Sequence, residues 1–202
     1  MSHPKILVIP GSLRTGSHNV RLAALAVKEL TLADAEVTRI SLQDFPLPIY
    51  DADLETKMGV PANALKLKQM MCAHAGIFIA CPEYNASVTP LLKNTIDWVS
   101  RVREKGEPAL PAFKNRVFAL GSASPRTFGG MRALMAVRQI LEVGCGALVI
   151  PEMVAVPFAE QAFDDKDELS DPRTANLLRA CLVRLIDMAR DVAGVEAVRM
   201  TR

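Results

Sequence analysis

Three short apolar runs limit most strongly what this chain can fold into. They are Lys5–Ile9, Gly76–Cys81 and Val117–Leu120, and a proline or a glycine closes each of them. A strand that is apolar at nearly every position is buried on both faces, as in a parallel sheet with helices on either side. We therefore expect an α/β protein built on a parallel sheet.

Segments with helical spacing of apolar residues separate these strands. We predict helices at Asn19–Leu32, Pro61–His74, Thr89–Val102, Gly130–Val143 and Asp171–Ala193. Two further strands are expected at Glu36–Ile40 and Ala147–Val156, the second kinked by Pro151, while two prolines should make Asp44–Tyr50 irregular. Strands that alternate with helices predict a doubly wound sheet of five parallel strands with helices on both faces. We expect residues 1–202 to form a single domain.

The composition argues against several classes of protein. The 202 residues carry 24 basic and 22 acidic side chains, and 5% of them are aromatic, which disfavours a nucleic-acid binder. Proline and glutamate break the apolar stretches well before the roughly 20 residues that cross a bilayer, so no membrane span is expected. The first strand follows the N-terminus almost directly and leaves no room for an export signal, which predicts a cytoplasmic protein.

Neither a metal site nor a catalytic triad is expected. The four cysteines, Cys72, Cys81, Cys145 and Cys181, form no C-x-x-C pair, and the chain has three histidines. We interpret the cysteines as reduced thiols that mostly fill the core. A G-x-S-x-G nucleophile elbow is also missing, which argues against an α/β hydrolase.

The loop after the first strand has the chemistry of a phosphate site. Doubly wound sheets bind ligands at the carboxyl ends of the strands, where the strand order reverses. Ser12, Ser17 and Asn19 can donate hydrogen bonds there, and Arg14 supplies charge beside a helix N-terminus. The loop lacks the Gly-Lys-Ser/Thr ending and the G-x-G-x-x-G pattern of other nucleotide sites. A second interpretation, compatible with the first, is that Ser17 or Asn19 caps the helix.

Three motifs together resemble one enzyme family. They are Gly-Ser-Leu-Arg-x-Gly-Ser-x-Asn, Pro-Glu-Tyr-Asn and Leu-Lys-Asn-x-Ile-Asp-Trp, and the resemblance runs roughly over residues 5–156. They resemble the NADPH-dependent FMN reductases, flavodoxin-like proteins that include chromate, quinone and azo-dye reductases. The resemblance implies a flavodoxin-like fold, bound FMN, and NADPH as cosubstrate with NADH as an alternative.

The same resemblance implies a ping-pong reaction in which the cofactor carries the chemistry and no side chain is catalytic. A hydride passes from NADPH to FMN, and an acceptor such as a quinone, an azo compound, a free flavin or chromate is then reduced. A homodimer or homotetramer is implied as well. The sequence does not identify the acceptor, the preference between NADPH and NADH, or the number of subunits.

The resemblance also implies which residues hold the cofactor. The FMN phosphate is expected at Ser12, Arg14, Ser17, Asn19 and the Val20 amide, and the flavin ring against Pro82, Glu83, Tyr84 and Asn85. Ser124 matches the serine of the family's Ser-x-Gly-x-x-Gly-Gly-x-Arg loop beside the flavin. For Lys93, Asn94, Asp97 and Trp98, which also match the family, we expect structural roles within a helix.

Arg126 departs from the family pattern, because the family usually has glycine at this position. Arginine adopts positive φ less easily than glycine, and its side chain would project near the flavin pocket. Two interpretations remain open: Arg126 contacts the NADPH phosphate or an anionic acceptor, or it is a solvated loop residue.

Two other functions are compatible with the sequence. A flavodoxin-type electron carrier would hold FMN without reacting with a nicotinamide; such carriers are commonly acidic, whereas this chain has a net charge of +2, which favours the reductase. A structural or regulatory protein could keep the fold and lose the flavin. The complete phosphate loop argues against that loss, and Arg126 argues for it.

Overall fold

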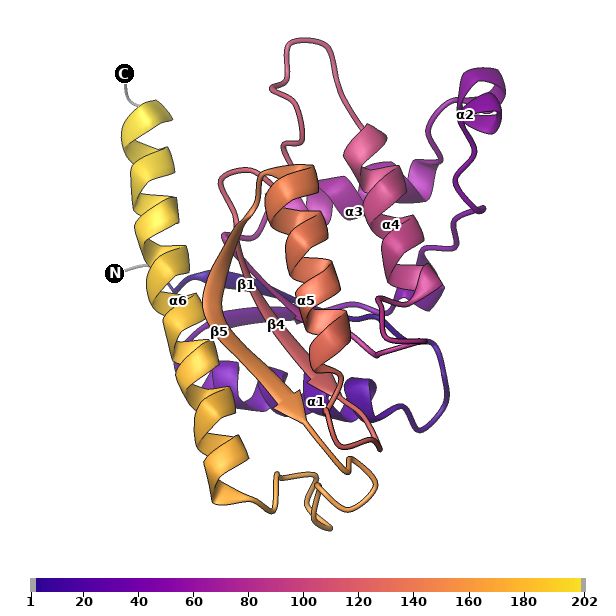
Figure 1. Ribbon diagram of the computed structural model, residues 1–202. Helices are drawn as coiled ribbons and strands as arrows, with labels where there is room; N and C mark the ends of the chain where they lie inside the picture. Colours follow the sequence, from indigo (N-terminus) through magenta and orange to yellow (C-terminus); the bar gives the residue numbers. More distant parts are fainter. Residues whose placement is uncertain (1–2, 201–202) are drawn as a thin grey trace.

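The fold is a five-stranded parallel sheet between two layers of helices (Figure 1). The computed structural model describes residues 3–200. The strands are β1 (Lys5–Pro10), β2 (Glu36–Arg39), β3 (Gly76–Ala80), β4 (Val117–Ala123) and β5 (Leu148–Val156). They lie in the order β2-β1-β3-β4-β5, and each neighbouring pair is parallel. This is the flavodoxin-like order, which confirms the predicted fold class.

The helices connect successive strands and close the chain. They are α1 (His18–Leu32), α2 (Ala52–Met58), α3 (Ala62–Cys72), α4 (Pro90–Arg101), α5 (Met131–Gln139) and α6 (Pro172–Met200). A 3-10 turn, Leu42–Asp44, follows β2, and a π-helical turn, Ile140–Gly144, extends α5. Within residues 3–200, no helix is long and apolar enough to cross a bilayer.

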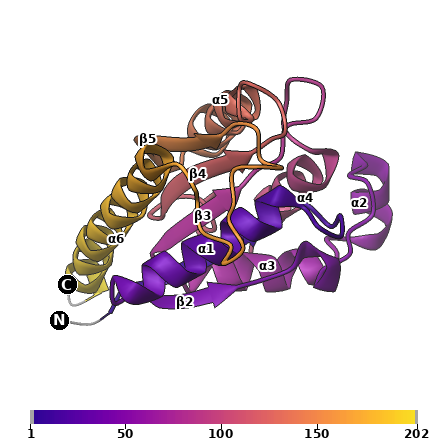
Figure 2. The same cartoon turned by 90° about the horizontal axis from the view of Figure 1, so that it is seen from below.

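The sheet divides the apolar core into two layers. Figure 2 shows the helices that lie on the two sides of the sheet. Successive side chains of a strand point to opposite faces. On β1, Ile6 and Val8 pack in the layer with α1 and α6, whereas Leu7 and Ile9 pack in the layer with α3, α4 and α5. The apolar residues of these runs are therefore buried on both faces of the sheet, as their composition predicts.

The observed elements differ from the predicted ones mainly at α2. This seven-residue helix has no buried residue, so it gives no apolar periodicity to detect. Its signals are at its ends: the Asp51 carboxylate caps it by accepting from the Asp53 and Leu54 amides, and Gly59 follows it with φ of 76°. The final helix also begins where predicted but runs farther, to Met200.

The predicted kink in the last strand takes the form of a register shift. Phe118 pairs with Val149 and Leu120 pairs with Met153, so the two strands advance by different numbers of residues around Pro151. A proline cannot donate to the sheet, and β5 lies at the edge, where such an interruption is tolerated.

Candidate active site

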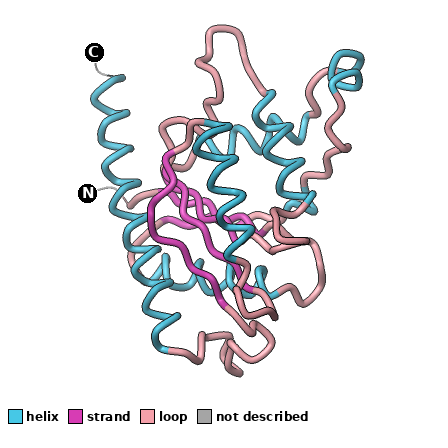
Figure 3. The backbone as a smooth tube through the Cα atoms, in the orientation of Figure 1, coloured by secondary structure: helices cyan, strands magenta, loops and turns pink. Residues whose placement is uncertain are grey.

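Three loops meet at the carboxyl edge of the sheet (Figures 1 and 3). They follow β1, β3 and β4, and the strand order reverses between β1 and β3. Backbone hydrogen bonds join them: the Gly11 amide donates to the Ala80 carbonyl at 2.8 Å, and the Cys81 amide donates to the Gly121 carbonyl at 2.8 Å. The Thr89 hydroxyl donates to the Gly11 carbonyl at 3.0 Å. The loops therefore hold one another in fixed positions.

Asn19 joins the first loop to the end of β4. Its Nδ2 donates to the Ala123 carbonyl at 2.7 Å, and its Oδ1 accepts from the Ala123 amide at 3.0 Å. The side chain is buried, with 3% of the residue exposed. The Asn19 side chain therefore binds the backbone of β4 and does not cap α1.

Ser17 is the N-cap residue of α1, but its side chain makes no capping hydrogen bond. Ser17 therefore occupies the predicted N-cap position without a capping hydrogen bond from its side chain, and the interpretation that Asn19 caps the helix is wrong. No acceptor within residues 3–200 pairs with the backbone N–H groups of His18 and Asn19, whereas the Val20 amide donates to the Ser17 carbonyl at 3.0 Å. A hydroxyl and two amides at the start of α1 are thus free to bind an anion.

Ser12 and Arg14 lie in the loop before this helix. The Ser12 hydroxyl accepts from the Arg14 amide at 3.2 Å and keeps its own proton to donate. Arg14 is exposed, and none of the described carboxylates forms an ion pair with its guanidinium. The loop therefore offers both a hydroxyl donor and an uncompensated positive charge.

His18 contributes no comparable charge. Burial lowers its pKa, the positive charges of Arg14 and Arg21 lower it further, and Glu160 acts in the opposite direction. Its Nδ1 atom is buried and has no hydrogen-bond partner in the described part of the chain. The imidazole is consequently expected to be neutral at pH 7.

The loop after β3 contains a tight turn. The amide of Tyr84 donates to the Ser87 carbonyl and the amide of Ser87 donates to the Tyr84 carbonyl, both at 3.0 Å. Between them Asn85 and Ala86 have φ of 49° and 64°. Two positive φ values are typical of a type I′ turn, a conformation that asparagine tolerates better than most residues. The turn follows Pro82 and presents Tyr84, half of whose surface is exposed.

Glu83 does not face the solvent beside these residues. Its side chain is 7% exposed, and its carboxylate accepts from the Arg132 backbone amide at 3.2 Å and from Arg132 Nε at 2.8 Å. The Arg132 guanidinium in turn lies 5.3 Å from the centre of the Phe128 ring. Glu83 thus ties the loop after β3 to the start of α5. Sequence reasoning missed this role of Arg132, although it is the arginine of the quoted Gly-Gly-x-Arg motif.

The loop after β4 is fixed through Ser124. Its amide donates to the Val156 carbonyl at 3.0 Å, its carbonyl accepts from the Ala159 amide at 3.0 Å, and its hydroxyl accepts from the Arg126 amide at 3.2 Å. Ser124 is buried. Arg126 is not among the residues with positive φ, so replacing the usual glycine imposes no backbone strain here.

The residues for which structural roles were expected hold the segment before α2 in place. The Asn94 side chain accepts from the Tyr50 amide and donates to the Pro48 carbonyl, both at 2.8 Å. Trp98 Nε1 donates to the same carbonyl at 2.7 Å. Lys93 pairs with Asp97 at 2.8 Å on the surface of α4.

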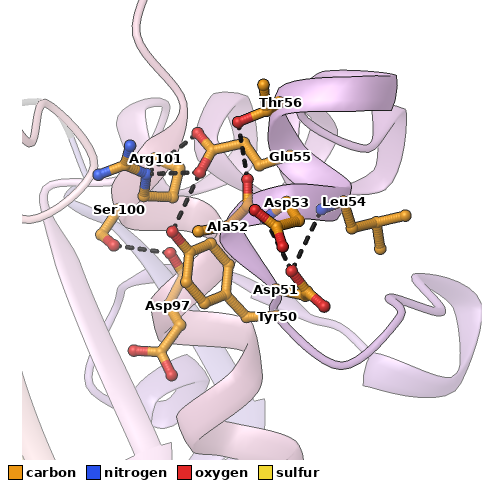
Figure 4. Close-up of polar contacts among 10 residues, drawn as sticks. All are labelled: Tyr50, Asp51, Ala52, Asp53, Leu54, Glu55, Thr56, Asp97, Ser100 and Arg101. Atoms are coloured by element: carbon orange, nitrogen blue, oxygen red, sulfur yellow. Dashed lines mark hydrogen bonds and ion pairs between the residues drawn. The ribbon is translucent and has the colours of Figure 1, made fainter.

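A polar cluster continues this contact at the end of α4 (Figure 4). The Tyr50 hydroxyl donates to Glu55 at 3.0 Å, and Arg101 Nε donates to both oxygens of the same carboxylate at 3.0 Å. The hydrogen bond to Glu55 is the main cause that raises the pKa of Tyr50 and of Arg101. Arg101 is the last residue of α4, whereas the three loops lie near its first turn. The cluster therefore supports α2 and is separate from the candidate site.

Comparisons with known proteins identify the family of this chain. The chain matches the family model described as NADPH-dependent FMN reductase over residues 4–161. It is 33% identical over 192 residues to an NAD(P)H-dependent FMN reductase of Pseudomonas aeruginosa, a match that covers 94% of this chain and 97% of the relative. A quinone reductase of Escherichia coli is 36% identical over 141 residues, which are 68% of this chain and 69% of that protein.

A solved structure shares the fold. FerB, a flavoenzyme NAD(P)H:(acceptor) oxidoreductase from Paracoccus denitrificans, is similar with a TM-score of 0.73 at 25% identity. The match covers 93% of this chain and 98% of FerB.

Proposed function

This chain belongs to the NADPH-dependent FMN reductase family, and we propose that it reduces quinone-type acceptors through an FMN held by the loops after β1, β3 and β4. As a family member it is an oxidoreductase that uses FMN and takes its electrons from NAD(P)H. Bound FMN supplies the redox chemistry, while the protein binds and orients the cofactor and the two substrates.

The free donors at the start of α1 carry the proposal. A phosphate is stabilised by unpaired amides and by the positive end of a helix dipole. The Ser17 hydroxyl and the His18 and Asn19 amides would hold the FMN phosphate, with Ser12 and Arg14 closing over it. Asn19 contributes its backbone, because its side chain is engaged by Ala123, and the Val20 amide is already used within the helix.

The flavin ring would lie against the loop after β3. Pro82, Tyr84 and Asn85 are at the carboxyl end of β3, beside the place where the strand order reverses. The Glu83 carboxylate already binds Arg132, so we expect Glu83 to stabilise the pocket and not to contact the flavin ring. Ser124 has the same supporting role in the loop after β4.

The two rival functions have less support. An electron carrier would share the phosphate site, but the net charge of +2 does not suit a protein that docks on basic partners. The proposal that flavin binding has been lost depended on Arg126, and the backbone at Arg126 is unstrained. We therefore retain the reductase.

We also propose a cytoplasmic homodimer or homotetramer. Met135 and Val143, on α5 and its extension, are 62% and 80% exposed. A cavity of about 510 Å³ lies beside Val143 between α4 and the extension of α5, and its lining mixes apolar with charged side chains. Exposed apolar side chains rimmed by polar ones are typical of contacts between subunits. Light scattering that gives the mass of a single chain would contradict the proposal.

A spectroscopic experiment tests the function directly. The purified protein is incubated with FMN, desalted, and treated with NADPH and then a quinone under argon. Retained flavin absorbance that bleaches with NADPH and returns with the quinone would support the reductase. Absorbance that neither NADPH nor NADH bleaches would favour the electron carrier. A protein that retains no flavin would contradict the proposal.

The Arg14→Ala variant tests the phosphate site. A charge-assisted hydrogen bond contributes about 1.5–3 kcal/mol, so we expect FMN to bind roughly tenfold or more weakly. Because Arg14 is exposed and has no ion pair among the described residues, the free energy of unfolding should not change. Arg184→Ala, an exposed arginine on α6, is the matched control. Equal FMN affinities in the two variants would remove Arg14 from the site.

A further inference from the structure

The loop after β4 carries an exposed turn on a rigid base. The Gly129 amide donates to the Arg126 carbonyl at 3.1 Å and closes the turn. Arg126, Thr127 and Phe128 are exposed, with 61% of the Phe128 surface accessible. A Cβ on Gly129 would lie 2.9 Å from the backbone of Val156, so the base is packed directly on the end of β5. The tip of the turn is therefore presented at a fixed place on the rim of the site.

The tip of the turn carries an aromatic side chain and a cationic side chain close together. The Phe128 ring is supported by the Arg132 guanidinium, whose charge is already matched by the nearly buried carboxylate of Glu83. Arg126 is different, because none of the described carboxylates forms an ion pair with it. The turn thus offers an aromatic ring for stacking and an uncompensated guanidinium within two residues of it.

We propose that Arg126 and Phe128 bind the adenosine 2′-phosphate end of NADPH and make this enzyme prefer NADPH over NADH. A guanidinium binds phosphate through paired, charge-assisted hydrogen bonds, and an exposed aromatic ring stacks on a purine of either dinucleotide. The inference depends on the proposed function, because it needs the flavin to lie between the three loops.

The position of the turn favours the dinucleotide over the acceptor. Hydride transfer requires the nicotinamide to lie against the flavin ring, so the adenosine end must extend away from it. Arg126 and Phe128 are exposed on the rim, whereas Ser124, Gly129 and Gly130 of the same loop are buried. A small acceptor that reacts at the ring has no need of the rim, but the far end of a dinucleotide does.

Two redox-inert nucleotides separate the two contacts. The Kd of 2′,5′-ADP and of 5′-AMP is measured calorimetrically for the FMN-loaded protein, for Arg126→Gly, for Phe128→Ala and for the control Arg184→Ala. We expect the native protein to prefer 2′,5′-ADP. Arg126→Gly should weaken 2′,5′-ADP roughly tenfold or more and leave 5′-AMP unchanged, whereas Phe128→Ala should weaken both to the same extent. The ratio of kcat/KM for NADPH and NADH should fall with Arg126→Gly alone.

Three results would overturn the inference. The first is equal binding of the two nucleotides by native protein that holds FMN. The second is an unchanged Kd for 2′,5′-ADP in Arg126→Gly. The third is that Arg126→Gly weakens naphthalene-2-sulfonate but neither nucleotide, which would assign the cation to an anionic acceptor. FMN retention is measured first in each protein, so native protein that binds no FMN contradicts the proposed function instead.

Discussion

Gly130 shows how a single missing Cβ shapes the candidate site. Its φ is 88°, in the left-handed region that favours glycine. A Cβ at this position would overlap the Ser122 hydroxyl and lie 2.7 Å from the Ser122 Cβ. Ser122 is fully buried, so neither its side chain nor an added methyl group has room to move. The approach of the loop to the end of β4 therefore depends on glycine here.

Gly130→Ala should consequently lower the free energy of unfolding by about 2–5 kcal/mol, the sum of a left-handed backbone and an overpacked contact. Gly106→Ala is the matched control, since its φ is 87° but no atom lies within 4 Å of the added Cβ. That variant should lose about 1–2 kcal/mol. Urea unfolding of both variants measures the difference, and equal losses would show that the Ser122 contact costs nothing.

For single residues, the sequence predicted the chemistry of the site better than it predicted the contacts between those residues. The small, hydroxyl-rich loop before α1 was recognisable because a phosphate at a helix N-terminus needs those residue types. The partner of Asn19 was not, because Ala123 lies 104 residues away and offers its backbone. Glu83 is similar: its bonds to Arg132 arise from the meeting of two loops, which no local pattern encodes. A local pattern therefore predicts which residue types form the site, but it does not predict which residues pair across the fold.

Among the elements, α4 fixes both the site and α2. At its start, Thr89 accepts from the Leu92 amide at 3.3 Å and donates to the Gly11 carbonyl. At its end, Arg101 binds Glu55 of α2. A seven-residue helix without a buried residue has little stability of its own, so α2 depends on this contact and on its cap. That dependence also explains why sequence periodicity predicted α4 and missed α2.

The titration of Tyr50 reports on this contact. Its pKa is raised because the hydroxyl donates to the Glu55 carboxylate, which disfavours the phenolate. Glu55→Gln removes that charge and should bring the pKa down towards the usual value for tyrosine. The measurement is phenolate absorbance during an alkaline titration. It is made in a Tyr84→Phe background, because the chain has two tyrosines.

The sign of the effect on stability follows from the raised pKa. The stabilising contribution is complete below the pKa of unfolded tyrosine and is lost as the pH rises through the higher pKa of the folded protein. Glu55→Gln should therefore lose less stability than the parent in this alkaline range. Asp187→Asn, which breaks an exposed pair with Arg190 on α6, should leave the Tyr50 titration unchanged. An unaltered titration in Glu55→Gln would show that the carboxylate does not control Tyr50.

On the scale of the whole molecule, the two core layers depend on the same five strands. Cys181 of α6 belongs to the layer with α1, whereas Cys81 and Cys145 belong to the layer with α3, α4 and α5. Burial raises the pKa of Cys81 and Cys181 to about 12 and that of Cys145 to about 11. These thiols are therefore almost entirely protonated and unreactive in the folded protein at pH 8. They can react once their layer opens.

This arrangement allows a test of the prediction that the chain is a single cooperative domain. Removing either helical layer would expose one face of every strand, so we expect both layers to open together with the free energy of global unfolding. Two variants are needed, one that keeps Cys81 and one that keeps Cys181, with the other cysteines replaced by alanine. Native-state labelling by a thiol reagent, at rising urea, gives the free energy of opening for each thiol, and urea unfolding of the same variant gives its global value. In each variant the two values should agree. Labelling of Cys181 at an opening free energy well below the global value would show that α6 detaches while the rest of the fold persists.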